Sequence, residues 1–316
     1  MHSLEDELQQ LRESGVIDDA TAAHAIAVEN GSLFTLYQEL RVGLYVAVSL
    51  IVAGIGLLLK EQMAHIGPLA IVTALAALAA LGYGHAIRAI MRGRERTLVG
   101  DYVLLLAALL LSADLGYAET QYHWLGQYSS LHLLLLAAIH AATAYALDSR
   151  LVLSLSLASL ATWFGAETRI AALLAYPRGM AESGARALAC ALLILLWRVL
   201  DRRLGRRQRF QEVLEHFAIN IACWGALAWC FNSPTRWGGL ATVFMIATLS
   251  IRRGLYRRSE LLVVYGVIYG AIAICATLAG AAGDPLTGLV IVLVTALGAA
   301  WLLLRWRRRL RLPSPA

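Results

Sequence analysis

Long apolar runs separated by short polar segments dominate the chain from residue 42 onward. A helix needs about 20 mainly apolar residues to cross about 30 Å of hydrocarbon. The runs predict ten membrane-spanning helices, at residues 42–59, 67–87, 101–117, 131–147, 151–166, 184–200, 217–232, 236–251, 261–280 and 285–304. The predicted fold class is therefore an all-α, polytopic transmembrane helical bundle of about ten spans.

The first 41 residues follow a different pattern. Leu4, Leu8 and Leu11 form one stripe at helical spacing, and Gly15 ends that helix before a second one begins. Eight acidic residues and two arginines give residues 1–41 a net charge of −6, against +12 for the remainder. We expect an acidic cytoplasmic hairpin at 1–41, the bundle at 42–304 and a basic cytoplasmic tail at 305–316. The hairpin either binds the basic membrane face or a protein partner, or is solvated without one.

The positions of the basic residues predict the direction of each span. With the N-terminus inside, 22 basic residues fall on inner segments and 5 on outer segments, and the bias alternates from loop to loop. Cytoplasmic loops of membrane proteins carry an excess of Lys and Arg. Both termini are therefore expected in the cytoplasm, and the acidic opening of the chain lacks the positive charge of a cleavable signal peptide.

Composition excludes a soluble domain, because the mean hydropathy is +0.65 and only 15% of residues are charged. The pI of 9.3 does not indicate nucleic-acid binding, since the arginines lie beside the spans. Anionic lipid head groups on the cytoplasmic side are the expected partner. Residues 201–216 combine arginines with an apolar stripe and predict a short interfacial helix. Its lipid-contact candidates are Arg202, Arg203, Arg206, Arg207 and Arg209.

No cofactor, metal site or catalytic activity is predicted. The four cysteines lie inside apolar runs without neighbouring histidines at metal-ligand spacing, which is typical of free thiols in helix packing. The chain has no phosphate-binding loop, HExxH motif or nucleophile elbow.

Polar groups concentrate between Gly100 and Leu147, within and between the third and fourth spans. A buried ionisable group in a membrane tends to face the bundle interior or a water-filled cavity. Two interpretations of His140, near the predicted midplane, remain open: a neutral histidine satisfied by neighbouring helices, or a proton-handling or ligand-binding group acting with Asp114. The remaining ligand or proton-handling candidates are His132, Glu119, Gln121 and His123. Glu119, Gln121 and His123, in the predicted loop, form either a metal or solute site or part of a solvated loop.

Two features resemble the domain-of-unknown-function 2157 family of predicted bacterial membrane proteins. One is Leu11-Arg-Glu-Ser-Gly15-Val-Ile17 followed by an alanine-rich helix before the membrane. The other is a third span ending in Gln121-Tyr122-His123, then Gly126, a fourth span, a very short turn and a fifth span ending near Trp163. The resemblance covers about residues 1–165. It implies a multi-pass protein of the bacterial inner membrane with a cytoplasmic N-terminal hairpin, and it supplies no catalytic residues.

Two function classes follow. The first is a non-catalytic bundle that senses, scaffolds or regulates envelope components. The second is a small-solute or ion transporter with a site near the third and fourth spans, built from two five-span halves of opposite orientation. A closed, tightly packed bundle favours the first class, and a water-accessible midplane cavity lined by His140 favours the second.

Overall fold

The computed structural model describes residues 14, 18, 37–62, 67–92, 97–128, 130–165, 177–205, 208–231, 235–257, 259–279 and 284–311. Nearly all of the acidic segment 1–41 therefore lies outside the described residues. Within them the chain is helical, and each predicted span corresponds to one α-helix. The helices are α3 (Tyr37–Gln62), α4 (Pro68–Met91), α5 (Leu98–Tyr122), α6 (Leu131–Leu147), α7 (Arg150–Gly165), α9 (Pro177–Arg203), α10 (Gln208–Cys230), α11 (Arg236–Arg257), α12 (Glu260–Ala279) and α13 (Pro285–Arg311), with a short 3₁₀ helix η1 (Gly126–Tyr128).

Six of these helices are long and apolar enough to cross a membrane, judged by length and composition: α4, α5, α9, α10, α12 and α13. Three shorter apolar stretches lie in α3, α6 and α7. The apolar side chains exposed on the bundle, such as Leu81, Leu293 and Leu297, are those that lipid would cover. The chain is thus a helical membrane protein.

The boundaries of three predicted segments change. Helix α3 begins at Tyr37, inside the segment assigned to the hairpin, and α13 continues to Arg311, so residues 305–311 extend the last helix. The interfacial helix predicted at 201–216 is wrong, because α9 runs to Arg203 and α10 begins at Gln208 and continues to Cys230. Phe210 and Leu214, which belong to the apolar stripe of that predicted helix, are fully buried in the main core, since they pack between helices.

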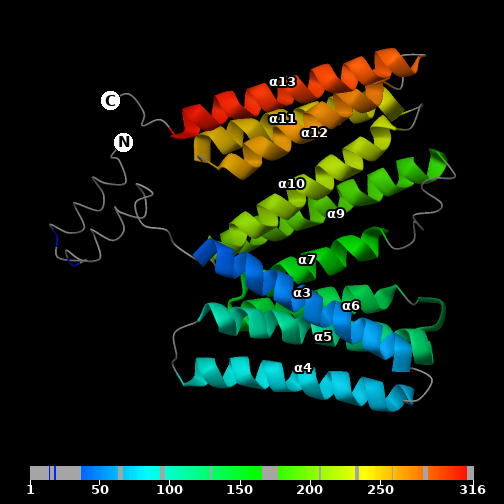
Figure 1. Cartoon of the computed structure of the whole chain (residues 1–316), viewed down its shortest axis with the longest axis vertical. Coiled ribbons are helices and arrows are strands. Elements are labelled where there is room, and N and C mark those ends of the chain that lie inside the picture. The colour runs from blue at the N-terminus through cyan, green and yellow to red at the C-terminus, as the bar shows by residue number, and fades with distance from the viewer. Residues whose placement is uncertain are drawn as a thin grey trace.

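Successive helices alternate in direction, so α3 begins and α13 ends on the same face of the helical layer (Figure 1). We name it the arginine-rich face, because the end of α9 there carries Arg202 and Arg203, and the end of α11 there carries Arg253 and Arg257. Local signals set the helix ends. Thr97 caps α5 by accepting a hydrogen bond from the Gly100 N–H (3.1 Å).

At the opposite face, Asp284 precedes Pro285 at the start of α13 and accepts a hydrogen bond from the Thr287 N–H (2.8 Å). Proline is favoured at the first helical position, where its missing N–H is not needed. Hydrogen bonds from the Thr287 side chain and backbone hold the pKa of Asp284 below its usual value.

The helices form hairpins stacked along the long axis: α4 with α5, α6 with α7, α9 with α10, and α11 with α12 (Figure 1). Helix α3 packs against α5, and α13 packs against α12. One large core cluster joins residues of α5, α6, α7, α9 and α10, among them Leu104, Leu157, Ile194 and Phe210. The interface between α5–α7 and α9–α10 is therefore filled by packed side chains.

The pair of hairpins α4–α5 and α6–α7 is repeated by the pair α9–α10 and α11–α12. Three helix boundaries recur 110 positions later in the chain. They are the start of α5 (98) and of α10 (208), the end of α6 (147) and of α11 (257), and the start of α7 (150) and of α12 (260). Helix α5 packs against α6 and α7, as α10 packs against α11 and α12. Buried residues recur at the same interval: Leu104 and Leu214, Ala108 and Ala218, Ala137 and Ala247, Val152 and Leu262, Leu153 and Val263, Leu157 and Val267. We name α4–α7 the first unit and α9–α12 the second unit.

The two units run in the same direction through the layer, because four helices separate the start of α4 from the start of α9 (Figure 1). This differs from the two inverted five-span halves considered from the sequence. In such halves α3 would correspond to α9, yet α3 packs against α5 whereas α9 packs along α10. The described helices repeat as parallel units instead.

Candidate functional site

The six candidates from the third and fourth spans do not form one cluster. Asp114, Glu119 and His140 are buried, whereas His123 is exposed and Gln121 and His132 are partly buried. Within the described residues, no three His, Cys, Asp or Glu side chains gather closely enough to hold a metal ion. The structure therefore separates the loop residues from the buried ones.

His140 has no solvent exposure and lies 2.8 Å, through Nε2, from the hydroxyl oxygen of Ser112 on α5. The same hydroxyl donates to the Ala108 carbonyl (2.9 Å). Which of Ser112 and His140 donates to the other depends on the imidazole tautomer. His140 is thus held between α5 and α6 by this hydrogen bond, and its Nδ1 atom is buried without a hydrogen-bond partner among the described residues.

Asp114 and Glu119 occupy separate places on α5. Among the described residues no hydrogen bond or ion pair joins Asp114 to His140, and the Oδ1 atom of Asp114 is buried without a hydrogen bond. The Oε2 atom of Glu119 accepts from the Leu125 N–H (3.2 Å). His123 ends the helix in the left-handed region (φ 46°), with its N–H bonded to the Glu119 carbonyl. Glu119 therefore closes the turn between α5 and η1.

The predicted lipid-contact arginines are partly described. Arg202, Arg203 and Arg209 are exposed at the arginine-rich face, and Arg206 and Arg207 lie outside the described residues. Gly205, in the left-handed conformation (φ 62°), ends α9 between these groups.

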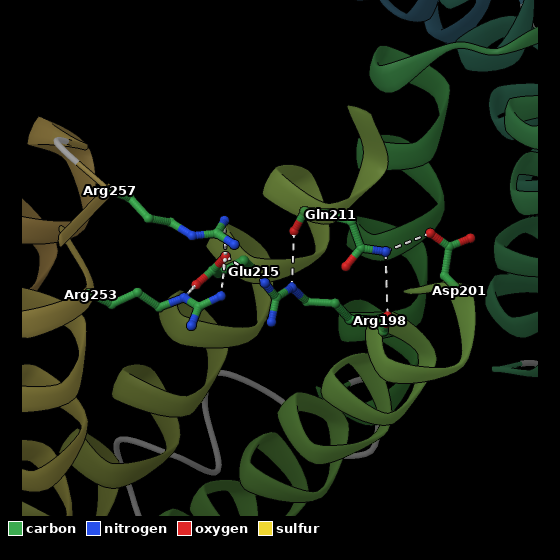
Figure 2. A network of polar contacts seen from close by, with 6 residues as sticks. All are labelled: Arg198, Asp201, Gln211, Glu215, Arg253 and Arg257. Carbon is green, nitrogen blue, oxygen red and sulfur yellow. Dashed lines mark hydrogen bonds and ion pairs between the residues drawn. The ribbon is translucent and has the colours of Figure 1, made fainter. Parts of the chain in front are cut away.

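The densest polar cluster lies where α9, α10 and α11 meet at the arginine-rich face. The Glu215 carboxylate on α10 is ion-paired with Arg198 of α9 (2.9 Å), Arg253 of α11 and Arg257 of α11 (3.2 Å). Figure 2 shows Glu215 between Arg253 and Arg257 on one side and Arg198 on the other. The Glu215 side chain is only 5% exposed, Arg198 14%, and Arg253 and Arg257 38% and 40%. We name these four residues the Glu215 cluster.

A second set of hydrogen bonds continues from this cluster toward the first unit. Arg198 donates through Nε to the Gln211 carbonyl (3.2 Å), and the Gln211 amide donates to Asp201 Oδ2 (2.7 Å; Figure 2). The Tyr145 hydroxyl donates to Asp201 Oδ1 (2.8 Å) and accepts from the Trp197 indole N–H (3.1 Å). The buried Asp201 carboxylate is thus satisfied by neutral donors from both units.

A partly open cavity of about 670 Å³ adjoins the Glu215 cluster between α9, α10 and α11. Its polar end is lined by Arg198, Glu215, Ser250, Arg252, Arg253 and Tyr256. A second cavity of about 430 Å³ lies between α11, α12 and α13 and is mainly apolar. His140 and Asp114 line neither of these two cavities.

Sequence reasoning missed the Glu215 cluster, because the arginines were counted only as topology signals. One usable signal was present: Glu215 lies directly beside the buried stripe formed by Phe210, Leu214 and Ala218. A charged residue beside the buried stripe of an apolar helix requires a partner, and the nearest arginine-rich segments supply it.

Comparisons with protein-family models, curated proteins and solved structures found no match to this chain.

Proposed function

We propose that this chain is a non-catalytic, multi-pass protein of the bacterial inner membrane that senses, scaffolds or regulates envelope components. In this proposal all ten helices cross the membrane and both termini are cytoplasmic. The resemblance to the 2157 family is part of the proposal. Arg202, Arg203 and Arg209 contact anionic head groups, and the acidic N-terminal segment is the contact for a cytoplasmic protein partner.

One observation carries the choice of class: the two units are joined by a continuous packed core. Leu157 of α7, Ile194 of α9 and Leu214 of α10 are fully buried in a single cluster. His140 is enclosed and hydrogen-bonded to Ser112. A closed interface between units supports a scaffold, because a transporter binds its substrate in a cavity near the midplane.

Transport of a small solute or ion is the alternative. The parallel repeat favours it, since some transporters are built from parallel repeats related by an axis along the membrane normal. A site near α5 and α6 would then need water to reach His140.

Thiol accessibility distinguishes these functions. We replace His140 with Cys in a background lacking the four native cysteines and treat the protein in liposomes with a membrane-impermeant thiol reagent. Trp124→Cys, at an exposed outer position, is the positive control. A scaffold leaves residue 140 unlabelled while residue 124 reacts, and rapid labelling at 140 would favour transport.

Topology is tested separately in intact cells. The same impermeant reagent is expected to label Trp124→Cys from outside and to leave Arg203→Cys unlabelled until the cells are opened. The reverse result, or labelling of both positions in intact cells, contradicts the proposed orientation.

A further inference from the structure

The Glu215 cluster carries more positive charge than its single carboxylate can neutralise. Three guanidinium groups surround Glu215, and a fourth, Arg252, lines the same cavity. Asp201, the nearest buried acid, is satisfied by Tyr145 and Gln211 instead. Four positive charges against one negative charge leave an excess of about three, which favours an anion in the cavity.

The guanidinium groups of Arg198 and Arg253 also retain N–H donors beyond those used in the hydrogen bonds described above. A guanidinium presents five N–H groups that suit carboxylate and phosphate oxygens. Hydrogen bonds of the described residues engage Nε and one terminal nitrogen of Arg198, whereas Arg253 uses one terminal nitrogen in a hydrogen bond and Nε in an ion pair, both to Glu215. The geometry thus leaves terminal N–H groups beside the cavity for a phosphate.

The other end of the cavity is apolar. Leu195, Ala218, Ile219, Ala222, Ile246 and Leu249 line it along α9, α10 and α11. A soluble anion would gain nothing from this wall, whereas an acyl chain buries its surface there. The volume of about 670 Å³ lies in the range of pockets that hold organic ligands, about 300–1,000 Å³.

The depth of the cluster fits a lipid head group. Arg253 lies four residues before the end of α11, and Arg198 five before the end of α9. At a rise of about 1.5 Å per residue, both lie about 6–8 Å inside the arginine-rich face. This is the level at which head group and acyl chain meet, about 5–10 Å deep.

The first unit indicates that the fold does not require this charge. The positions equivalent to Glu215, Arg253 and Arg257 are Leu105, Thr143 and Leu147, which are neutral, and the position equivalent to Arg198 is Arg88, which is exposed. Leu105 is buried and packs with Val48 and Tyr102. The same helical arrangement is therefore stable without an ionic cluster.

We propose that the groove between α9, α10 and α11 binds an anionic glycerophospholipid of the membrane leaflet that borders the arginine-rich face. Its phosphate lies against Arg252 and Arg253, and one acyl chain lies along Ile219, Ile246 and Leu249. This inference rests on the membrane embedding proposed above. Basic pockets between transmembrane helices on the cytoplasmic side are suited to such head groups.

The test is native mass spectrometry of the full chain in detergent, titrated with phosphatidylglycerol or phosphatidylethanolamine carrying identical acyl chains. Glycerol 3-phosphate is the competitor that represents a free phosphate ester. We expect phosphatidylglycerol to bind at least about tenfold more tightly than phosphatidylethanolamine. Glycerol 3-phosphate should compete weakly, because it lacks the chain.

Three variants locate the site. Arg252→Gln, outside the Glu215 ion pairs, should weaken phosphatidylglycerol binding roughly fivefold. Arg92→Gln removes the same charge at the end of α4, an exposed position outside the cavity, and should change binding less than about twofold. Ala222→Phe fills the apolar wall and should weaken both lipids. Thermal midpoints confirm that each variant is folded.

Equal affinity for the two lipids, or equal losses from Arg252→Gln and Arg92→Gln, would overturn the proposal. Full competition by glycerol 3-phosphate would assign the site to a soluble phosphate ester instead. Unchanged binding in Ala222→Phe would place the lipid elsewhere. Failure of the membrane topology appears independently in the labelling of residues 124 and 203, so the two failures are distinguishable.

Discussion

The first and second units place different chemistry at the same point of one repeated arrangement. Where Leu105 is buried in α5, the second unit has Glu215 in α10. Where α6 has Thr143 and Leu147, α11 has Arg253 and Arg257. A buried carboxylate in a membrane is costly unless paired, so Glu215 requires its arginine partners; the first unit lacks the carboxylate and keeps only Arg88, at the position equivalent to Arg198.

The hydrogen-bonded pair Ser112 and His140 of the first unit lies farther from the arginine-rich face than the Glu215 cluster does. His140 is bonded to Ser112, and the equivalent residues of the second unit are Ser250 and Ala222. Ser250 donates instead to the Leu262 carbonyl of α12 (2.7 Å). The first unit thus holds a hydrogen-bonded pair within its packed interior, whereas the second holds an ion-paired cluster beside a cavity. The comparison assigns ligand binding to the second unit.

The largest expected effect comes from Glu215→Gln. Loss of the carboxylate leaves three guanidinium groups repelling one another, and removing one member of a buried ion pair costs about 3–5 kcal/mol. Because Arg253 and Arg257 are about two-fifths exposed, we expect the lower end, about 3 kcal/mol. Reversible SDS titration in mixed micelles measures this loss of unfolding free energy.

Glu212→Gln is the matched control for Glu215→Gln. Glu212 lies one turn earlier on α10, is exposed and is 4.0 Å from Arg150, so its loss should cost less than about 1 kcal/mol. The reciprocal exchange, Leu105→Glu, buries a carboxylate without a cation and should destabilise the first unit at least as much as Glu215→Gln destabilises the second. Tolerance of Leu105→Glu would contradict the contrast between the units.

A second prediction concerns the close approach of α9 and α10. A Cβ added at Gly225 would lie 2.7 Å from the Gly184 carbonyl oxygen. Because that contact is with backbone, Gly225→Val must separate the helices and is expected to cost about 1–3 kcal/mol. The SDS titration again measures it, and Gly116→Val is the control, since a Cβ there meets nothing within 4 Å. Equal losses at both positions would contradict the close helix contact.

The third prediction tests the link between the units. Tyr145→Phe removes the hydroxyl that donates to Asp201 and accepts from Trp197. Leaving a buried acceptor unsatisfied costs about 1–3 kcal/mol. Thermal unfolding followed by tryptophan fluorescence should show a lower midpoint, with Tyr128→Phe, an exposed residue, as the unchanged control. An unaltered midpoint in Tyr145→Phe would show that the link does not stabilise the interface.

The smallest effect is expected from Ser112→Ala, which removes the hydroxyl hydrogen-bonded to His140 Nε2. Hydrogen bonds between membrane helices contribute about 0.6 kcal/mol on average. We therefore expect a loss of about 1 kcal/mol or less in the SDS titration. Ser154→Ala is the control, because that hydroxyl bonds only within its own helix, to the Arg150 carbonyl. A loss above that of Glu215→Gln would give the first unit the more important polar site.

Apolar runs and loop charges along the chain were enough to predict ten helices that alternate in direction, although several helix ends differ in the structure. Apolar run length is a local property, and the excess of arginine on alternate loops requires no tertiary contact. For this reason the helix predicted at 131–147 coincides with α6. The very short turn after Leu147 is local as well, formed by Asp148 in the left-handed region and the Ser149 N–H bonded to the Ala144 carbonyl.

Only the tertiary structure decided which polar groups meet. Glu215 pairs with arginines 17 and 42 positions away, on two other helices. His140 pairs with Ser112 rather than with Asp114, because neighbouring residues of a helix point in different directions and the rotation of α5 against α6 selects one of them. Helix rotation is set by the packing of small and apolar side chains across the hairpins. That packing depends on the whole bundle, so hydropathy and charge along a single chain do not contain it.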